Sequence, residues 1–423
     1  MPIAAELTST SLRERYLHVR QRSLSLCEPL TPEDMMVQSC VEASPAKWHL
    51  AHTAWFFESF VLSPFQAGYR VFDRDFPWLF NSYYQSFAEF PDKRLRASFS
   101  RPALSEVLGY RHHVDEAVNL LLEGDADEEA LRRIELGLNH EEQHQELLLT
   151  DIQHALFTNP LQPAYLPAIA EQEGVAESLT FVSNQGGLVE IGHSGNQFSF
   201  DNERPRHRVW LEPFQVASRL VTCAEYAEFI ADGGYRRPEF WLSPGWLSVQ
   251  EHRWEAPLYW RKRPGDSTGW TIFTLRGLGH LAGMANAPVT HVSYFEADAY
   301  ARWAGKRLLT EAEWETVAAQ SAVEGNLLES GAMHPEPAAT TQDIPAQLFG
   351  DCWEWTASAY LGYPGFEPLA GSLGEYNGKF MSGQMVLRGG SCVTPAAHIR
   401  ATYRNFFPPE TRWQFSGIRL ATR

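Results

Sequence analysis

The stretch DEEALRRIELGLNHEEQHQELLLTDIQHALF (residues 127–157) carries apolar residues at intervals of three and four. That spacing is typical of an amphipathic helix, and Asp127 is suited to cap its N-terminus. The same periodicity recurs in three further stretches, at residues 11–26, 45–65 and 103–124. Ser105 is an expected helix start and Gly124 an expected stop. Four such helices between residues 10 and 157 predict a helical bundle.

The pattern changes after the last of these helices. Residues 159–178 contain three prolines and little periodicity, which predicts a linker. Short strand-like runs then alternate with glycine-rich turns, at residues 179–193, 206–222 and 385–392. Residues 295–320 predict two helices, the second opened by a capping box of Thr310 and Glu313. The second half of the chain is therefore expected to be an α+β domain.

Composition narrows the function classes. A net charge of −17 over 423 residues disfavours a nucleic-acid partner, because phosphates repel such a surface. No apolar run is long enough to span a bilayer, so no membrane association is expected. The five cysteines are scattered and the first residues lack an apolar leader segment, so we expect a cytoplasmic protein with reduced thiols.

Two histidines within the first stretch suggest a metal site. His140 and His144 stand four residues apart on a predicted helix, so their rings share one face. A third ligand is expected from the predicted helix at residues 45–65, where His52 follows His49 by one turn. Three neutral imidazoles suit zinc, iron or copper equally well.

The pair also matches H-E-x-x-H, the signature of zinc peptidases, in which Glu141 would be the general base. A third histidine six residues after His144 would be needed for one large peptidase class, but the next one, His154, comes ten residues later. A downstream glutamate ligand remains possible, and a peptidase is kept as a remote alternative.

Several longer motifs carry a family resemblance. The segments PVTHVSYFEADAYARWAGKRLLTEAEWE (288–315), GDCWEWTASAY (350–360), VLRGGSC (386–392) and RNFFPPETRWQFSGIRLA (404–421) resemble the formylglycine-generating-enzyme-like domain. The first half resembles the DinB-like bundle. Fused in this order, the two resemble the iron-dependent sulfoxide synthases of ergothioneine biosynthesis and the related selenoneine synthase. The resemblance implies an α+β protein with a DinB-like four-helix bundle at 1–158, a linker at 159–178 and a formylglycine-generating-enzyme-like, C-type-lectin-related domain at 179–423.

The resemblance also implies a reaction. Family members bind Fe(II) through three histidines, which fall at His52, His140 and His144, and they use O2 as co-substrate. The expected acceptor is hercynine, the trimethylbetaine of histidine, whose quaternary ammonium suits aromatic faces. The positions that match the acceptor site, or are weaker candidates for it, are Gln143, Asn405, Phe406, Phe407, Tyr376 and Trp413.

A tyrosine pair, Tyr83 and Tyr84, stands where one branch of the family has tyrosines beside the iron. A phenol there is expected to donate a proton or hydrogen atom and so to favour bond formation over donor oxidation. The second domain is not expected to generate formylglycine, because Thr394 and Ile399 replace the cysteine pair of that activity. We expect it to be a scaffold for substrate binding.

The donor stretch departs from the family pattern. Ergothioneine enzymes use two arginines to bind the donor carboxylate, and here those positions hold Lys93 and Arg96, with Arg94 between them. Lysine does not replace the bidentate fork of arginine. We therefore favour a selenosugar donor and a selenoneine synthase. The alternative is an ergothioneine sulfoxide synthase that uses cysteine or γ-glutamylcysteine, and a more remote one is an inactive betaine-binding protein.

Overall fold

The computed structural model describes residues 9–168, 178–262, 269–339 and 344–423, and the chain forms two compact units. The first unit comprises residues 1–160 together with two short later segments, 195–198 and 369–376. The second unit comprises the remainder. Of the predicted linker, residues 169–177 lie outside the described part of the chain.

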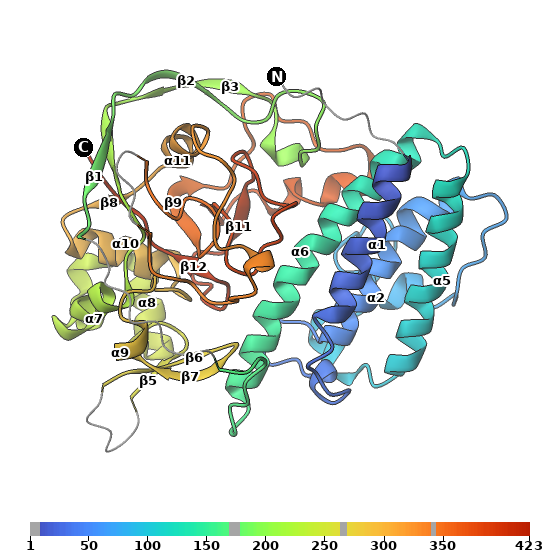
Figure 1. Ribbon diagram of the computed structural model, residues 1–423, viewed down its shortest axis with the longest axis horizontal. Helices are drawn as coiled ribbons and strands as arrows, with labels where there is room; N and C mark the ends of the chain where they lie inside the picture. The colour runs from blue at the N-terminus through green and yellow to red at the C-terminus, as the bar shows by residue number, and fades with distance from the viewer. Residues whose placement is uncertain (1–8, 169–177, 263–268, 340–343) are drawn as a thin grey trace. The chain divides into compact units, whose positions relative to one another are not determined.

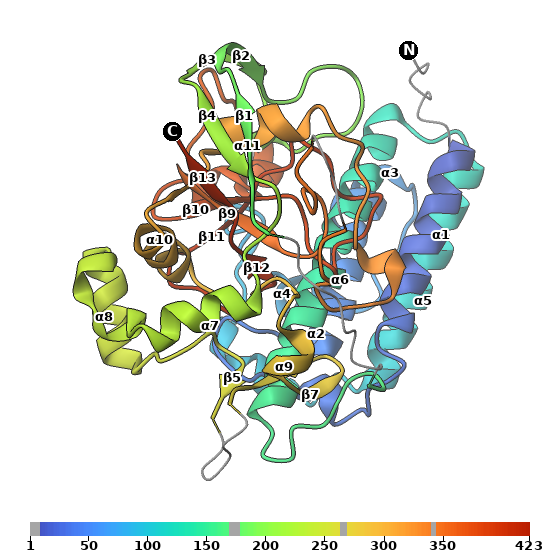
Figure 2. The same ribbon diagram turned by 60° about the vertical axis from the view of Figure 1, so that its left-hand side comes forward.

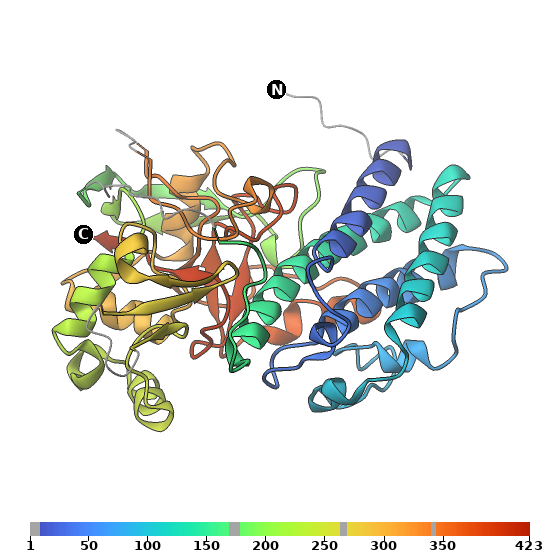
Figure 3. The same cartoon turned by 60° about the horizontal axis from the view of Figure 1, so that its bottom comes forward.

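The first unit is the predicted helical bundle. Its long helices are α1 (Ser9–Ser25), α2 (Ala46–Phe57), α5 (Leu104–Glu123) and α6 (Glu128–Thr158). Helices α1 and α2 each pack against both α5 and α6 (Figures 1 and 3). Helix α2 continues through a π-helical turn, Glu58–Leu62, into α3 (Ser63–Phe65).

Local signals set the helix ends as predicted, with one exception. Asp127 caps α6 by accepting a hydrogen bond from the Glu129 amide, and Gly124 ends α5. The predicted start at Ser105 is wrong, because α5 already begins at Leu104. The loop between α2 and α5 contains α4 (Phe76–Leu79) and a 3₁₀ helix at Lys93–Ser98.

The second unit contains short strands in small sheets. One sheet has the order β1-β4-β13-β8 and another the order β11-β10-β9-β12. Their strands are β1 (Phe181–Asn184), β4 (Phe214–Ala217), β8 (Arg307–Leu308), β9 (Trp353–Ala359), β10 (Met385–Arg388), β11 (Asn405–Phe407), β12 (Ser416–Gly417) and β13 (Leu420–Thr422). Two smaller sheets comprise β2 (Gly187–Ile191) with β3 (His207–Leu211), and β5 (Trp260–Arg261), β6 (Thr271–Thr274) and β7 (Gly277–His280).

Helices border these sheets. They are α7 (Cys223–Ala231), α8 (Ser243–His252), α9 (Leu281–Met284), α10 (Tyr294–Trp303) and α11 (Glu311–Ala318). The capping box of Thr310 and Glu313 opens α11 as predicted. Figure 2 shows the β2–β3 hairpin at one end of this unit and α7 and α8 at another. The mixture of helix and short strands confirms the predicted α+β class.

Within the described residues, no helix combines the length and apolar character needed to cross a bilayer.

Candidate metal centre

Three imidazoles converge inside the bundle. His52 comes from α2, and His140 and His144 come from α6, with one nitrogen of each ring within 4.8 Å of the others. The His52 Nε2 atom and both ring nitrogens of His140 are buried and have no hydrogen-bond partner among the described residues. A buried polar atom without a partner is costly, and ligation to a metal removes that cost. These residues therefore fit a metal that accepts imidazole ligands.

The ring of His52 is held firmly by its neighbours. Its Nδ1 atom lies 2.6 Å from the Phe80 carbonyl oxygen, which can only accept, so Nδ1 carries the proton and Nε2 keeps its lone pair. The indoles of Trp48 and Trp55 stack on the two sides of the ring, with centroids 4.4 and 5.1 Å away. Neither tryptophan was among the residues predicted for the site, although the spacing 48, 52, 55 is helical.

The three candidate ligands are suited to be neutral at physiological pH. Burial lowers the pKa of His140 to about 3, although the charge of Glu141 opposes this. Burial, followed by the neighbouring histidines, lowers the pKa values of His52 and His144 well below the usual range. A neutral imidazole is the form that binds metal.

Glu141 is not placed to act as a peptidase base. Its carboxylate is buried and accepts hydrogen bonds from Arg20 at 2.8 Å, Arg111 at 2.9 Å and Ser23 at 2.6 Å. Burial alone raises the pKa of Glu141, but the two guanidiniums and the hydroxyl outweigh it and bring the pKa to about 2. A carboxylate held this strongly as an anion is a poor proton acceptor. Its role here is to pair charges that hold α1, α5 and α6 together.

Gln143 and Tyr376 meet beside the ligand pair. The Tyr376 hydroxyl donates a hydrogen bond to the Gln143 side-chain oxygen, and its ring centroid lies 5.6 Å from that of His140. Tyr376 belongs to the segment 369–376, which forms part of the first unit despite its position late in the chain. Tyr376 was one of the weaker candidates for the acceptor site, and in the structure it lies next to a predicted metal ligand.

The tyrosine pair lies in the loop that follows α4. The rings of Tyr83 and Tyr84 stack with centroids 4.6 Å apart, and Tyr84 also lies 5.5 Å from Trp55. Burial raises the pKa of both phenols, with smaller contributions from Tyr83 and Tyr376 to that of Tyr84. Both are therefore protonated at neutral pH. The indole of Trp55 connects the pair to His52.

The predicted donor residues have different surroundings. Arg96 is 5 % exposed, stacks 3.5 Å from the Trp48 ring and donates to the hydroxyls of Ser44 and Ser82. Arg94 lies at the surface in an ion pair with Asp92, and the exposed Lys93 donates to the Glu42 carbonyl. Of the three cations, Arg96 alone is buried close to the histidines. Burial lowers the pKa of Arg96 to about 9, partly offset by Asp151.

The remaining predicted residues lie in the second unit. Phe406, on β11, stacks on Tyr360 with ring centroids 3.9 Å apart, and Phe407 lies 6.2 Å from Trp413. The Asn405 side-chain oxygen accepts a hydrogen bond from the Phe406 amide. Together these residues present aromatic faces and an amide at one edge of a sheet.

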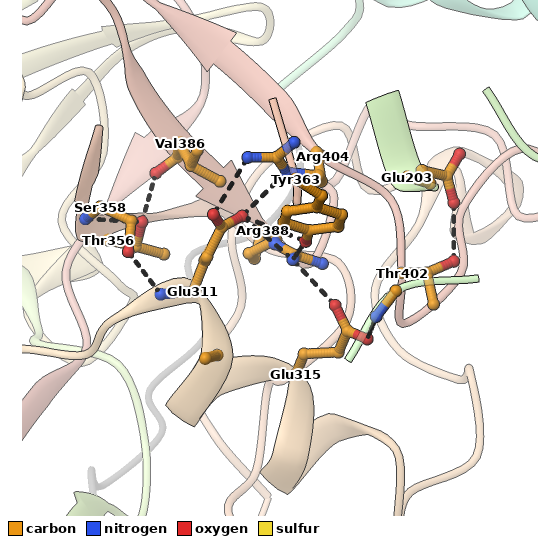
Figure 4. Close-up of polar contacts among 12 residues, drawn as sticks. Glu203, Glu311, Glu315, Thr356, Ser358, Tyr363, Val386, Arg388, Thr402 and Arg404 are labelled. Carbon is orange, nitrogen blue, oxygen red and sulfur yellow. Dashed lines mark hydrogen bonds and ion pairs between the residues drawn. The ribbon is translucent and has the colours of Figure 1, made fainter. Parts of the chain in front are cut away.

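A buried charge network anchors the start of β11. Glu311 accepts two hydrogen bonds from Arg404, at 2.9 and 3.0 Å, and one from Arg388 at 3.2 Å (Figure 4). Arg388 also pairs with Glu315, and Tyr363 lies under the Arg404 guanidinium at 4.0 Å. Because Arg404 directly precedes Asn405, this network fixes the backbone from which Asn405, Phe406 and Phe407 project.

Comparison with known proteins places this geometry in a family. The description "Sulfatase-modifying factor enzyme 1-like domain" matches residues 167–342 and 345–423, and "DinB superfamily" matches residues 15–155. The hercynine oxygenase of Mycolicibacterium smegmatis is 35% identical over 316 residues, which cover 68% of this chain and 71% of that protein. This chain belongs to the hercynine oxygenase family. Family membership confirms the resemblance drawn from the motifs.

The chain is also similar to two other proteins. Ergothioneine biosynthesis protein 1 of Schizosaccharomyces pombe is 26% identical over 53% of this chain and 27% of that protein. The solved structure of PvdO from Pseudomonas aeruginosa covers 59% of this chain and 98% of its own, with 20% identity and a TM-score of 0.38. At the positions of the formylglycine-generating cysteine pair this chain has Thr394 and Ile399, both buried.

Proposed function

We propose that this protein is a non-haem Fe(II)- and O2-dependent synthase that joins a chalcogen to C2 of the hercynine imidazole, with a selenosugar as donor. The observation that carries the proposal is the set of three converging imidazoles in a chain related to hercynine oxygenases, two of them with buried nitrogens that find no partner among residues 9–168, 178–262, 269–339 and 344–423. Bound iron would supply the oxygen chemistry. An inactive betaine-binding protein has no use for such a cluster.

The residues around the histidines support an acceptor beside His140. Gln143 and Tyr376 together offer an amide and a phenol there. The aromatic faces of Phe406, Phe407 and Trp413 are suited to a trimethylammonium group, which cannot donate hydrogen bonds and binds by cation–π attraction. Asn405 adds a polar contact from the same strand.

The tyrosine pair is proposed as the proton source. Tyr84 is fully buried and protonated, so it can donate without competition from bulk water. A positioned acid contributes on the order of 10²–10⁴-fold to a rate. Proton delivery from this side would favour formation of the carbon–chalcogen bond over oxidation of the donor alone.

The donor stretch supports a sugar over an amino acid. A carboxylate is bound best by a bidentate guanidinium, and family members with amino-acid donors are expected to use two arginines. Here Arg94 forms an ion pair with Asp92 on the surface, and Lys93 replaces the first arginine. The groups left to bind a donor are the buried guanidinium of Arg96 and the hydroxyls of Ser44 and Ser82. Hydroxyl groups of a sugar pair well with such a mixed set.

One observation favours a second candidate, the ergothioneine sulfoxide synthase. Arg96 forms no ion pair among the described residues, and a buried guanidinium of this kind attracts an anion. In that reaction a thiol and the imidazole C–H group combine with O2 to give a sulfoxide and one water. The donor would then be cysteine or γ-glutamylcysteine.

Anaerobic reconstitution with Fe(II) tests these proposals. The protein is exposed to O2 with hercynine and an equimolar mixture of selenosugar and each thiol donor, and the products are identified by mass spectrometry. We expect the selenium product to dominate. Dominance of a sulfoxide would establish the second candidate, and the absence of any hercynine adduct with an iron-loaded protein would reject both.

A further inference from the structure

His49 lies one helical turn before His52 on α2 and has no part in the proposed ligand set. Its ring is 3 % exposed and both of its nitrogens are engaged. Nδ1 lies 2.8 Å from Nδ1 of His144, and Nε2 lies 3.0 Å from an Asp151 carboxylate oxygen. Because both nitrogens have protein partners, His49 is not a fourth ligand. It connects a carboxylate to a predicted metal ligand.

The partners fix where the protons lie. An ionised carboxylate only accepts, so if His49 carries a single proton, that proton lies on Nε2 and Nδ1 keeps a lone pair. The same Asp151 oxygen also accepts from the Ser44 amide at 2.7 Å, which holds the carboxylate in place. Nδ1 of His144 must then donate to His49. The lone pair of His144 is consequently on Nε2.

We propose that Asp151 and His49 are positioning residues that hold His144 in the tautomer whose Nε2 binds the metal. The inference rests on the proposed metal centre and adds to it a relay of two side chains, from Asp151 through His49 to His144. Hydrogen bonds from the second nitrogen of a metal-bound histidine commonly set the ring orientation and the basicity of the ligand. His52 achieves the same tautomer with the Phe80 carbonyl.

The hydrogen bonds that orient His52 and His144 differ in whether a side-chain substitution can remove them. The Phe80 carbonyl is part of the backbone, whereas the relay to His144 depends on side chains from α2 and α6 that lie 95 and 102 residues apart in sequence. His144 is the most exposed of the three ligands. Without the relay its ring would be free to rotate or to carry its proton on Nε2, and in that tautomer Nε2 cannot bind a metal.

The wild-type protein, free of metal, provides the first test. Long-range ¹H–¹⁵N correlation spectra of protein labelled with ¹⁵N-histidine distinguish the two neutral tautomers. We expect His144 and His52 to be protonated at Nδ1 and His49 at Nε2. Protonation of His144 at Nε2 would overturn the inference, whether or not the enzyme proves active.

A pair of variants tests the consequence for metal binding. The side chain of His49→Gln offers an amide oxygen to His144 and an amide N–H to Asp151, whereas His49→Leu offers neither. Titration of the metal-free protein with Co(II), followed by its visible absorption, should show affinity near wild type for His49→Gln. For His49→Leu we expect a loss of about 10–100-fold, typical of removing an outer partner of a ligand.

The outcomes separate the two proposals. If the wild type binds no Co(II) or Fe(II), the metal centre itself is rejected. If it binds and His49→Leu binds equally well, with an unchanged spectrum, the relay is rejected and the metal centre stands. Far-UV circular dichroism reports whether His49→Leu folds, and the tautomer spectra of the wild type decide the question if it does not.

Discussion

Two clusters of buried polar groups, one in each unit, differ in how their hydrogen bonds are satisfied. Around Glu311 in the second unit, carboxylates and guanidiniums pair with one another inside the protein. At His52 and His140 in the first unit, three buried ring nitrogens have no hydrogen-bond partner in the part of the chain that the structure describes. Paired groups of the first kind are typical of structural networks, and convergent unpaired ones are typical of ligand sites. Satisfaction of hydrogen bonds thus distinguishes scaffold from site.

The largest effect is expected from removing a ligand. His140→Ala should abolish iron binding and turnover and leave the helical content unchanged, because the ring makes no hydrogen bond to any described residue and alanine favours a helix. Metal analysis after anaerobic reconstitution, together with circular dichroism, measures both. His154→Ala is the matched control, since His154 lies on the same helix and bonds to Ser39. Full activity in His140→Ala would contradict the assignment.

Removal of the phenols should have the next largest effect. The double change Tyr83→Phe and Tyr84→Phe should slow bond formation by roughly 10²–10⁴-fold, the usual contribution of a positioned acid, and shift the products toward oxidised donor. Product ratios by mass spectrometry measure the shift. Tyr69→Phe, which removes a hydroxyl bonded to Glu58, should keep the wild-type ratio. An unchanged ratio in the double variant would exclude the pair as the acid.

Removing Glu311 from the charge network of the second unit should lower the stability of the protein. Glu311→Ala leaves the buried Arg404 without a carboxylate partner and leaves Arg388 with Glu315 alone. Removing one partner of a buried ion pair typically costs about 3–5 kcal/mol. Urea denaturation should therefore show a large fall in the free energy of unfolding. Glu128→Ala, which removes an exposed ion pair with Arg132, should leave the curve unchanged. Equal curves for both variants would show that the network is dispensable.

The smallest effect concerns the donor. Arg96→Gln should raise the KM for cysteine-type donors about tenfold to hundredfold, since a charged hydrogen bond is worth about 1.5–3 kcal/mol. The KM for a selenosugar should change little. Arg94→Gln should alter neither, because Arg94 pairs with Asp92 at the surface. A larger loss with the selenosugar than with the thiols would contradict the proposed difference in how Arg96 binds the two kinds of donor.

Local and recurrent signals were visible in the sequence. The four helices, the cap at Asp127, the capping box at Thr310 and the α+β class all follow from short-range patterns, and the structure confirms them. The convergence of His140 with His144 follows from helical spacing. His52 was already the best candidate for the third ligand on the neighbouring helix, and the family resemblance gave it the same role.

Contacts that join distant parts of the chain were not predictable in this way. Tyr376 forms a hydrogen bond with Gln143, which lies 233 residues earlier in the sequence. No local pattern indicates that residues 369–376 belong to the first unit. The Phe80 carbonyl that orients His52 is a backbone atom, which leaves no trace in residue identity. The contacts of His49 with His144 and Asp151 could not be predicted either, although His49 itself stands out in the sequence as one turn from His52. Such contacts depend on tertiary packing rather than periodicity.

The return of residues 369–376 to the first unit has a consequence for how this protein can be divided. Glu375 accepts hydrogen bonds from the Gln85 and Ser86 amides, and Tyr376 bonds to Gln143. A fragment that ends near Pro160 would lack all three contacts, so the bundle is not a self-contained module. Exchange of bundles between relatives would have to transfer this late segment as well, and a cut in the stretch after α6 would leave two pieces that still share part of their structure.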